Sequence, residues 1–220
     1  MSEQVKHPAK YTDVLLPVMA QYLHGYKRIL DPMAGVGGIF KLYDYLDDDV
    51  VIMGIELEPE WVNAHPRVMQ GDALHLNQFE DGFFDAIVVS PGYANRMSDK
   101  LSKGKWAGTR ISYADSLGRD LSPGNGAALQ WGDKYRDLHE DAWVEAARVL
   151  RPDGRFVLNI KDHYRNYQRQ YVTDWHIEVL CSMGFSVVAH EKVKTKGMRR
   201  GENHALRIDY ESVVVLDRLT

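Results

Sequence analysis

The chain has 220 residues, a single cysteine (Cys181) and a formal net charge of −4 at pH 7. Its apolar fraction of 45% and charged fraction of 26% are those of an ordinary globular protein, and its length normally corresponds to one domain with a sizeable core. One cysteine excludes an internal disulfide and a multi-cysteine metal site, and the lack of a long apolar run excludes a membrane-spanning helix, so we expect one cytoplasmic domain over residues 1–220 without metal.

Short apolar runs alternate with segments of helical periodicity along the chain. In chain order we expect helix 11–24, strand 28–30, helix 38–46, strand 50–55, helix 58–64, strands 67–69 and 83–89, helix 134–150, strand 155–160, helix 171–183, and strands 185–193 and 207–216. This alternation predicts an α/β fold with a mostly parallel seven-stranded sheet and helices on both faces. The last two strands are expected to form a C-terminal antiparallel β-hairpin.

The segment 94–133 interrupts this pattern, because it is rich in Gly, Ser, Lys and Arg and has no sustained periodicity. Five basic residues lie between Arg96 and Arg110 against one acidic residue, and six lie in 192–207 against one. Seven acidic residues and no basic ones lie in 44–60. Each cluster alone is typical of a solvated loop, whereas two basic clusters at one sheet edge would form a face for a polyanion. Loops as long as 94–133 are usually functional or disordered.

A glycine-rich turn, Asp31-Pro32-Met33-Ala34-Gly35-Val36-Gly37-Gly38, follows the first strand. Ligands of open parallel sheets bind beyond the carboxyl ends of the strands, where glycines let the backbone approach them. Glu56 ends the second strand, twenty-one residues after Gly35, which is close to the spacing expected for a ribose-binding acid. Asp72 follows the third strand and could hold an adenine amino group or cap a helix. Nicotinamide cofactors use similar geometry, although Asp31-Pro32 before the glycines counts against a dinucleotide turn.

Two turns carry a family resemblance. The segment 31–38 resembles the first motif of class I S-adenosylmethionine-dependent methyltransferases, in the style of the amino-directed DNA methyltransferases, and Ser90-Pro91-Gly92-Tyr93 resembles their catalytic Ser/Asp-Pro-Pro-Tyr motif. The segments 7–11, 54–58, 148–154 and 211–216 match further parts of that family in the same order. The resemblance implies a Rossmann-like fold that binds S-adenosylmethionine and releases S-adenosylhomocysteine. The cofactor-binding residues it implies are Lys10, Tyr11, Asp31, Pro32, Ala34, Gly35, Gly37, Gly38, Glu56, Leu57, Asp72 and Ala73.

The resemblance also implies a mechanism at Ser90, Pro91, Gly92 and Tyr93. The Ser90 side chain and the Pro91 carbonyl would accept hydrogen bonds from an exocyclic amine, which aims the nitrogen lone pair at the methyl group. Tyr93 would stack on a base flipped out of the helix. A leading Ser favours cytosine N4 over adenine N6. Gly92 departs from the family, which usually has a second proline there, and a glycine makes the turn less rigid.

DNA is the expected partner, either double-stranded with base flipping or single-stranded, as in a phage or solitary modification system. The insertion loop 94–133 is expected to contact DNA. The residues expected to contact DNA are Asn95, Arg96, Lys100, Lys103, Lys105, Trp106, Arg110, Lys194, Lys196, Arg199 and Arg200. Two alternatives remain open: an RNA base N-methyltransferase, and a catalytically impaired nucleic-acid-binding relative in which Gly92 marks the loss of activity. A nicotinamide oxidoreductase is a more remote reading.

Overall fold

The computed structural model describes residues 7–8, 11–103, 112–195 and 204–220. Several residues with a predicted role lie outside these ranges, so their prediction is not tested here. They are Lys10, Lys105, Trp106, Arg110, Lys196, Arg199 and Arg200, together with the side chain of Arg96.

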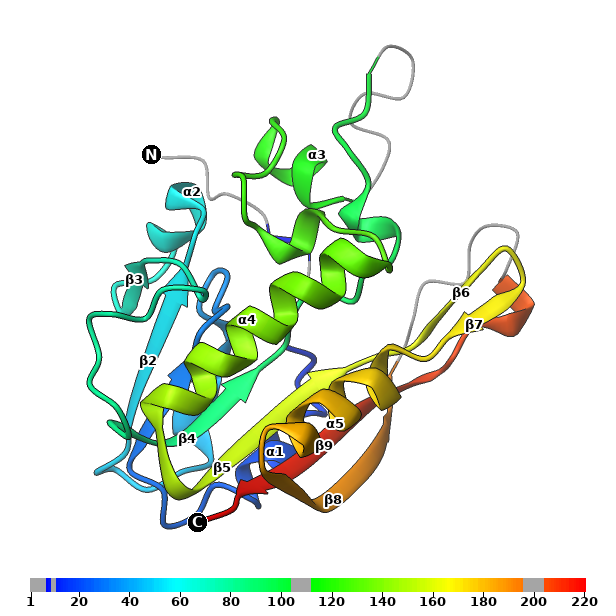
Figure 1. Cartoon of the computed structure of the whole chain (residues 1–220). Coiled ribbons are helices and arrows are strands. Elements are labelled where there is room, and N and C mark those ends of the chain that lie inside the picture. Colours follow the sequence, from blue (N-terminus) through cyan, green and yellow to red (C-terminus); the bar gives the residue numbers. More distant parts are fainter. Residues whose placement is uncertain (1–6, 9–10, 104–111, 196–203) are drawn as a thin grey trace.

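A seven-stranded sheet forms the centre of the molecule, with the strand order β3-β2-β1-β4-β5-β9-β8 (Figure 1). Its strands are β1 (Arg28–Asp31), β2 (Val51–Glu56), β3 (Val68–Gln70), β4 (Phe84–Val89), β5 (Leu150–Ile160), β8 (Phe185–Lys194) and β9 (Tyr210–Arg218). The strands β3, β2, β1, β4 and β5 run parallel to one another, and β9 runs antiparallel to both β5 and β8. The mostly parallel sheet with a C-terminal antiparallel hairpin confirms the predicted fold.

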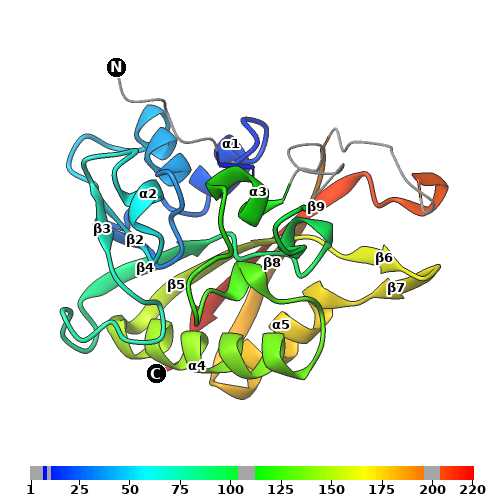
Figure 2. The ribbon, with the colours of Figure 1, turned by 90° about the horizontal axis from the view of Figure 1, so that it is seen from above.

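Helices cover both faces of the sheet. The α-helices are α1 (Leu16–Ala20), α2 (Pro59–Val62), α3 (Tyr113–Leu117), α4 (Asp133–Val149) and α5 (Val172–Ser182). The 3-10 helices are η1 (Gly38–Asp44), η2 (Arg96–Ser98), η4 (Gly126–Ala128) and η5 (His204–Leu206). Figures 1 and 2 show α4 and α5 on one face of the sheet and α1 on the other. No helix in the described part of the chain is long and apolar enough to cross a membrane.

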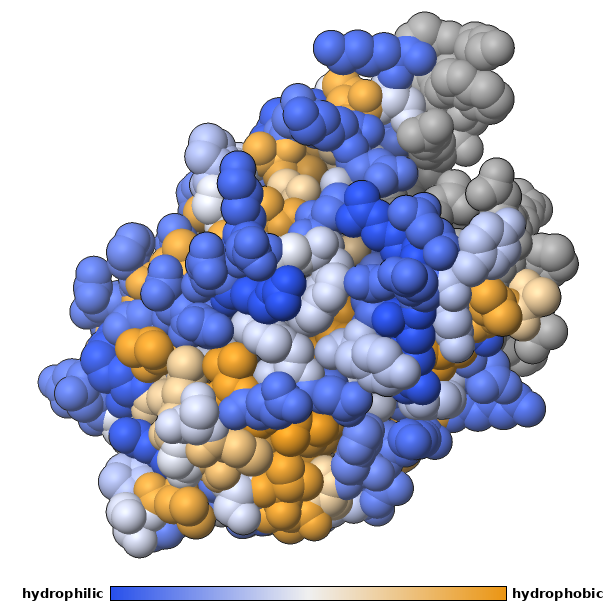
Figure 3. Space-filling view, turned by 45° about the vertical axis from the view of Figure 1, so that its right-hand side comes forward, coloured by the Kyte–Doolittle hydropathy of each residue, from blue (hydrophilic) through white to orange (hydrophobic). Residues whose placement is uncertain are grey.

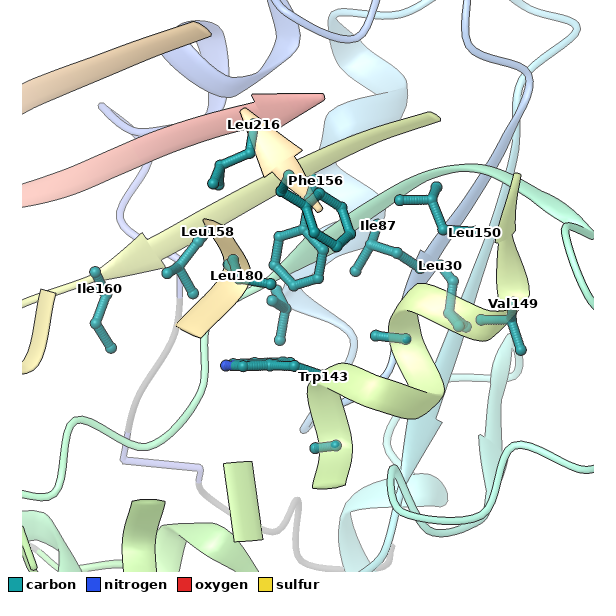
Figure 4. Close-up of a cluster of buried hydrophobic side chains, with 14 of the residues drawn as sticks. Leu30, Ile87, Trp143, Val149, Leu150, Phe156, Leu158, Ile160, Leu180 and Leu216 are labelled. Atoms are coloured by element: carbon teal, nitrogen blue, oxygen red, sulfur yellow. The ribbon is translucent and has the colours of Figure 1, made fainter. Parts of the chain in front are cut away.

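The central strands are buried on both faces, which explains why they read as continuous apolar runs. Along β4, Ile87 and Val89 pack in the core beneath α4 and α5, whereas Ala86 and Val88 pack in the core on the α1 side. Figure 4 shows Trp143 of α4 facing the sheet residues of the first core. The two cores fix the sheet between its helices, so the carboxyl ends of the parallel strands have a defined place.

Three elements differ locally from those expected. The helix expected over 11–24 is reduced to α1, because Pro17 has no N–H and is accepted only in the first turn of a helix. The helix expected over 38–46 is the 3-10 helix η1. β5 begins at Leu150 and includes the residues of the turn expected over 151–154.

A short hairpin, β6 (His163–Arg165) and β7 (Gln168–Gln170), is absent from the predicted elements. Its two turn residues, Asn166 and Tyr167, have φ values of 49° and 63°. Two left-handed residues are typical of a type I′ turn, but the sequence lacks the glycine that usually identifies one. The hairpin therefore lacked a clear signal in the sequence.

Candidate active site

A pocket of about 340 Å³ lies at the carboxyl ends of the parallel strands. The turns that follow β1, β2, β3 and β4 contribute to it, and the segment 124–127 contributes another part of its wall. These strand ends point toward the upper part of the molecule in Figure 1. The upper part of the face shown in Figure 3 is mostly hydrophilic. The predicted site residues that line the pocket are Tyr11, Pro32, Ala34, Gly35, Gly38, Glu56, Leu57, Asp72, Ala73, Ser90, Pro91, Gly92, Tyr93 and Asn95.

The glycine turn after β1 is held against the end of β2. Gly35 and Gly37 have φ values of 53° and 80°, a left-handed conformation that favours glycine. The Gly35 N–H donates to Oε2 of Glu56 at 2.9 Å, and the Ala34 N–H donates to the Ile55 carbonyl at 2.8 Å. The turn therefore exposes its backbone to the pocket while the Glu56 carboxylate holds it in place.

Glu56 and Asp31 are buried carboxyl groups on neighbouring strands. Burial raises the pKa of Glu56 to about 7, although the N–H groups of Glu58 and Gly35 oppose the shift. Burial also raises the pKa of Asp31 to about 7, against the opposing hydrogen bonds from the Met33 N–H and the Tyr11 hydroxyl. Asp31 does not line the pocket but lies behind Tyr11, which does.

The turn after β4 places Ser90 and Tyr93 beside two polar residues from neighbouring strands. The Ser90 hydroxyl lies 3.1 Å from the Tyr93 hydroxyl and 3.1 Å from Oδ1 of Asn159 on β5. The Tyr93 hydroxyl lies 2.9 Å from Asn159 Oδ1 and donates to Oε2 of Glu211 on β9 at 2.9 Å. Burial and the nearby Glu211 charge raise the pKa of Tyr93 well above its usual value, so the phenol stays protonated.

Gly92 is a site of close backbone approach. A Cβ at this position would lie 2.8 Å from the Cα of Ala127 in η4. The Gly92 carbonyl accepts a hydrogen bond from the Tyr135 hydroxyl of α4 at 2.8 Å, and that hydroxyl lies 3.0 Å from Nε2 of His176 in α5. The Trp143 indole donates to Nδ1 of His176, so Nε2 carries the proton and donates to Tyr135. A buried chain of hydrogen bonds thus connects the turn to both helices.

Residues 112–133, the second half of the segment 94–133, pack over the pocket on the β2 side. Their attachment point is Glu58, whose side chain is 0% exposed. The Glu58 carboxylate accepts hydrogen bonds from Arg119 Nη2, the Ser122 N–H and hydroxyl, and Asn125 Nδ2. This half of the segment predicted to contact DNA therefore forms part of the pocket wall, with Gly124, Asn125, Gly126 and Ala127 facing the cavity.

The remaining predicted residues have other surroundings. Asp72 accepts the Leu74 N–H at 2.9 Å within a turn and lines the pocket; no helix lies in the described residues between β3 and β4, so Asp72 is not a helix cap. Gly37 is packed beneath Phe40 and His65. Lys100, Lys103 and Lys194 are exposed and do not line the pocket.

Sequence reasoning missed Asn159, Glu211 and Glu58 as site residues. Asn159 reaches Ser90 and Glu211 reaches Tyr93 only because β5 pairs with β4 and β9 with β5, and strand order is not visible in a single sequence. The polar Asn159 within the otherwise apolar run Phe156–Ile160 is a signal that could have identified it. In the described residues, no three or more His, Cys, Asp or Glu side chains form a group that could hold a metal ion.

No family model and no curated protein matches the chain, whereas many solved structures do. An S-adenosylmethionine-dependent methyltransferase from Methanosarcina mazei has a TM-score of 0.58 and 12% identity, with 92% of this chain and 97% of that chain covered. A protein from Clostridium thermocellum, proposed to be an rRNA methylase, has a TM-score of 0.52 and 10% identity, covering 96% and 99%. The cyclase SpnF has a TM-score of 0.55 and 15% identity, covering 98% and 86%. The chain therefore has the fold of S-adenosylmethionine-dependent methyltransferases, a fold that also occurs in a cyclase.

Proposed function

We propose that this protein transfers a methyl group from S-adenosylmethionine to an exocyclic amino nitrogen of a DNA base, with cytosine N4 favoured over adenine N6. The observation that carries the proposal is that one pocket joins two turns. The glycine turn with Glu56 lies along one part of the pocket, and Ser90 and Tyr93 lie along another. A cofactor and an acceptor held in these two parts would lie side by side, as group transfer requires.

The residues present fit a nucleoside-type cofactor. Each oxygen of the Glu56 carboxylate accepts one backbone N–H, from Gly35 or Glu58, and keeps a lone pair for a ribose hydroxyl. The exposed backbone of Gly35 and Gly38 can approach the cofactor closely. Leu57, Ala73 and Leu74 supply apolar surface for a flat ring. Bound S-adenosylmethionine supplies an electrophilic methyl group on a sulfonium ion.

The acceptor turn supplies positioning. Ser90 and the Pro91 carbonyl accept hydrogen bonds from the two N–H groups of the amine, which draws the nitrogen toward tetrahedral geometry and frees its lone pair. The Tyr93 ring presents a flat surface to the base. Charge balance requires that the nitrogen lone pair forms the new N–CH₃ bond, that the C–S bonding pair remains on sulfur, and that the amine then loses one proton.

An RNA base is the second candidate acceptor. It is supported by the structural likeness to a protein proposed to be an rRNA methylase. The acceptor turn makes the same contacts with an amino group in either nucleic acid. DNA and RNA are therefore compared in one experiment.

The test incubates the protein with S-adenosylmethionine and unmodified genomic DNA or total RNA, digests each to nucleosides and analyses them by mass spectrometry. We expect N4-methylcytosine in the DNA digest and its loss in Ser90→Ala. Methylated nucleosides found only in the RNA digest would show that the acceptor is an RNA base and not a DNA base. Unmodified DNA and RNA, with cofactor binding demonstrated by calorimetry, would contradict nucleic-acid methylation and leave the cofactor site intact.

A further inference from the structure

We infer that Asn159 and Glu211 are positioning residues that turn the Ser90 hydroxyl into a pure hydrogen-bond acceptor toward the pocket. The inference rests on the proposed function and deepens it by naming the substrate chemistry of the acceptor end. A site whose side-chain polar atoms accept hydrogen bonds selects a group rich in N–H, such as an aromatic amine. It disfavours carboxylates and phosphates, which carry no hydrogen to donate.

The orientation of the Asn159 side chain is the first step. Its Nδ2 faces two acceptors, the Ser212 carbonyl and Glu211 Oε2, each at 3.4 Å. Its Oδ1 faces two hydroxyl groups, those of Ser90 and Tyr93. An amide rotated by 180° would point its N–H₂ group away from these acceptors and its oxygen toward them. Asn159 is 1% exposed, so this oxygen must be satisfied by the hydroxyl groups.

The hydrogen of Tyr93 is the second step. Tyr93 remains protonated and lies 2.9 Å from both Asn159 Oδ1 and Glu211 Oε2, which can only accept. If Tyr93 donated to Ser90 instead, its oxygen would face a carboxylate oxygen and an amide oxygen with no hydrogen between them. The Tyr93 hydrogen therefore goes to Glu211, because a carboxylate oxygen is a stronger acceptor than an amide oxygen, and the Tyr93 oxygen is free to accept.

The hydrogen of Ser90 follows from these two steps. The two atoms within hydrogen-bond distance of its hydroxyl described above, Asn159 Oδ1 and the Tyr93 oxygen, are acceptors in this arrangement. The single Ser90 hydrogen is used within the protein, and the lone pairs of its oxygen remain for the pocket. Ser90 thus acts as an acceptor without carrying a charge. Glu211, which also lines the pocket, adds a carboxylate to the same surface.

The first experiment reads the hydrogen bonds directly and needs no substrate. Protein labelled with ¹³C at the Cζ atom of tyrosine is studied by NMR, with Tyr93→Phe and Tyr22→Phe used to assign two signals. We expect Glu211→Gln to shift the Tyr93 signal, because a neutral amide oxygen is a weaker acceptor than a carboxylate. Glu191→Gln is the matched control, since Glu191 accepts the Tyr22 hydroxyl at 2.7 Å outside the pocket and should shift only the Tyr22 signal.

The second experiment measures single-turnover methyl transfer and cofactor affinity in Asn159→Leu and Glu211→Gln. We expect the transfer rate to fall about 100-fold in Asn159→Leu, as for a misplaced reacting group, with the dissociation constant of S-adenosylmethionine unchanged. Ser90→Asp restores an acceptor without help from Asn159, so Ser90→Asp/Asn159→Leu should be faster than Asn159→Leu alone.

The outcomes separate this inference from the proposed function. An unchanged Tyr93 signal in Glu211→Gln, or equal rates for Asn159→Leu and wild type, would overturn the inference while methyl transfer stands. If the wild-type protein methylates neither DNA nor RNA, the proposed function fails, and the NMR comparison still decides whether Glu211 holds the Tyr93 hydrogen.

Discussion

At the scale of single residues, packing explains why the acceptor turn has Gly92 at the position where the family pattern has a second proline. The nearest atom to a Cβ at this position is the Cα of Ala127, which is part of the backbone and cannot rotate away. Gly92 therefore allows η4 to rest directly on the turn, and η4 in turn lines the pocket. The turn is also held by the Tyr135 hydroxyl through the Gly92 carbonyl. The rigidity that a second proline would supply comes here from packing.

Gly92→Ala is expected to lower the free energy of unfolding by about 1–3 kcal/mol, as overpacking typically does. It should also weaken binding of S-adenosylmethionine, because η4 must move away from the pocket. Urea denaturation and calorimetry measure the two effects. Adding Ala127→Gly should not restore stability, since the contact is with Cα, and a full rescue would show that the side chain of Ala127 causes the clash.

At the scale of elements, the buried Glu58 carboxylate makes most of the hydrogen bonds that attach the segment containing α3 and η4 to the connection between β2 and α2. Burial disfavours the charged form of Glu58, but hydrogen bonds from Ser122, Arg119 and Asn125 outweigh it and lower its pKa. Arg119 also contacts Glu60 at 2.6 Å, whose side chain is 35% exposed. Glu58 is therefore the residue on which the position of this pocket wall depends.

Glu58→Gln should loosen the segment, because hydrogen bonds to a charged group contribute about 1.5–3 kcal/mol each and a glutamine keeps only part of them. Hydrogen exchange of the amides in 119–126 is expected to accelerate about 10- to 100-fold, at about 1.4 kcal/mol per tenfold change. Glu60→Gln is the matched control and should have a smaller effect, since Glu60 contacts only Arg119 among these residues. Equal effects of the two variants would contradict the role of Glu58.

At the scale of the whole molecule, the fold places two carboxyl groups at adjoining strand ends in its interior. Asp31 of β1 and Glu56 of β2 each have a pKa raised to about 7 from ordinary values near 4. Between about pH 4 and about pH 7, these two groups bind more protons in the folded protein than in the unfolded chain. Their contribution to stability is therefore fully present below about pH 4 and is lost as the pH rises through about 7. Cofactor binding that needs the Glu56 carboxylate has the opposite dependence and weakens below about pH 7.

Asp31→Asn tests this pH dependence. An asparagine can accept the Met33 N–H with its oxygen and donate to the Tyr11 oxygen with its nitrogen, so one hydrogen bond remains at each position, with the donor reversed at Tyr11. We expect the variant to be more stable than wild type at pH 8, and the difference to shrink as the pH falls toward 5. Urea denaturation across this range measures it. A constant difference at all pH values would show that the pKa of Asp31 is not raised.

The sequence alone was sufficient for the order of strands and helices along the chain, because buried strands such as β4 and amphipathic helices such as α4 have local patterns of apolar residues. It also located the glycine turn and the acceptor turn, whose residue types are local. It did not predict the hairpin β6–β7, whose Asn166-Tyr167 turn has no glycine, or the short length of α1.

Only the tertiary structure brought Asn159 to Ser90 and Glu211 to Tyr93, placed Ala127 on Gly92 and attached the segment after α3 to Glu58. These contacts join residues that lie 35 (Gly92 and Ala127) to 118 (Tyr93 and Glu211) positions apart in the sequence. Local patterns determine which segments become strands and helices. The order in which strands pair depends on the free energy of the whole packed core, so the chemistry at their ends is decided only when the chain has folded.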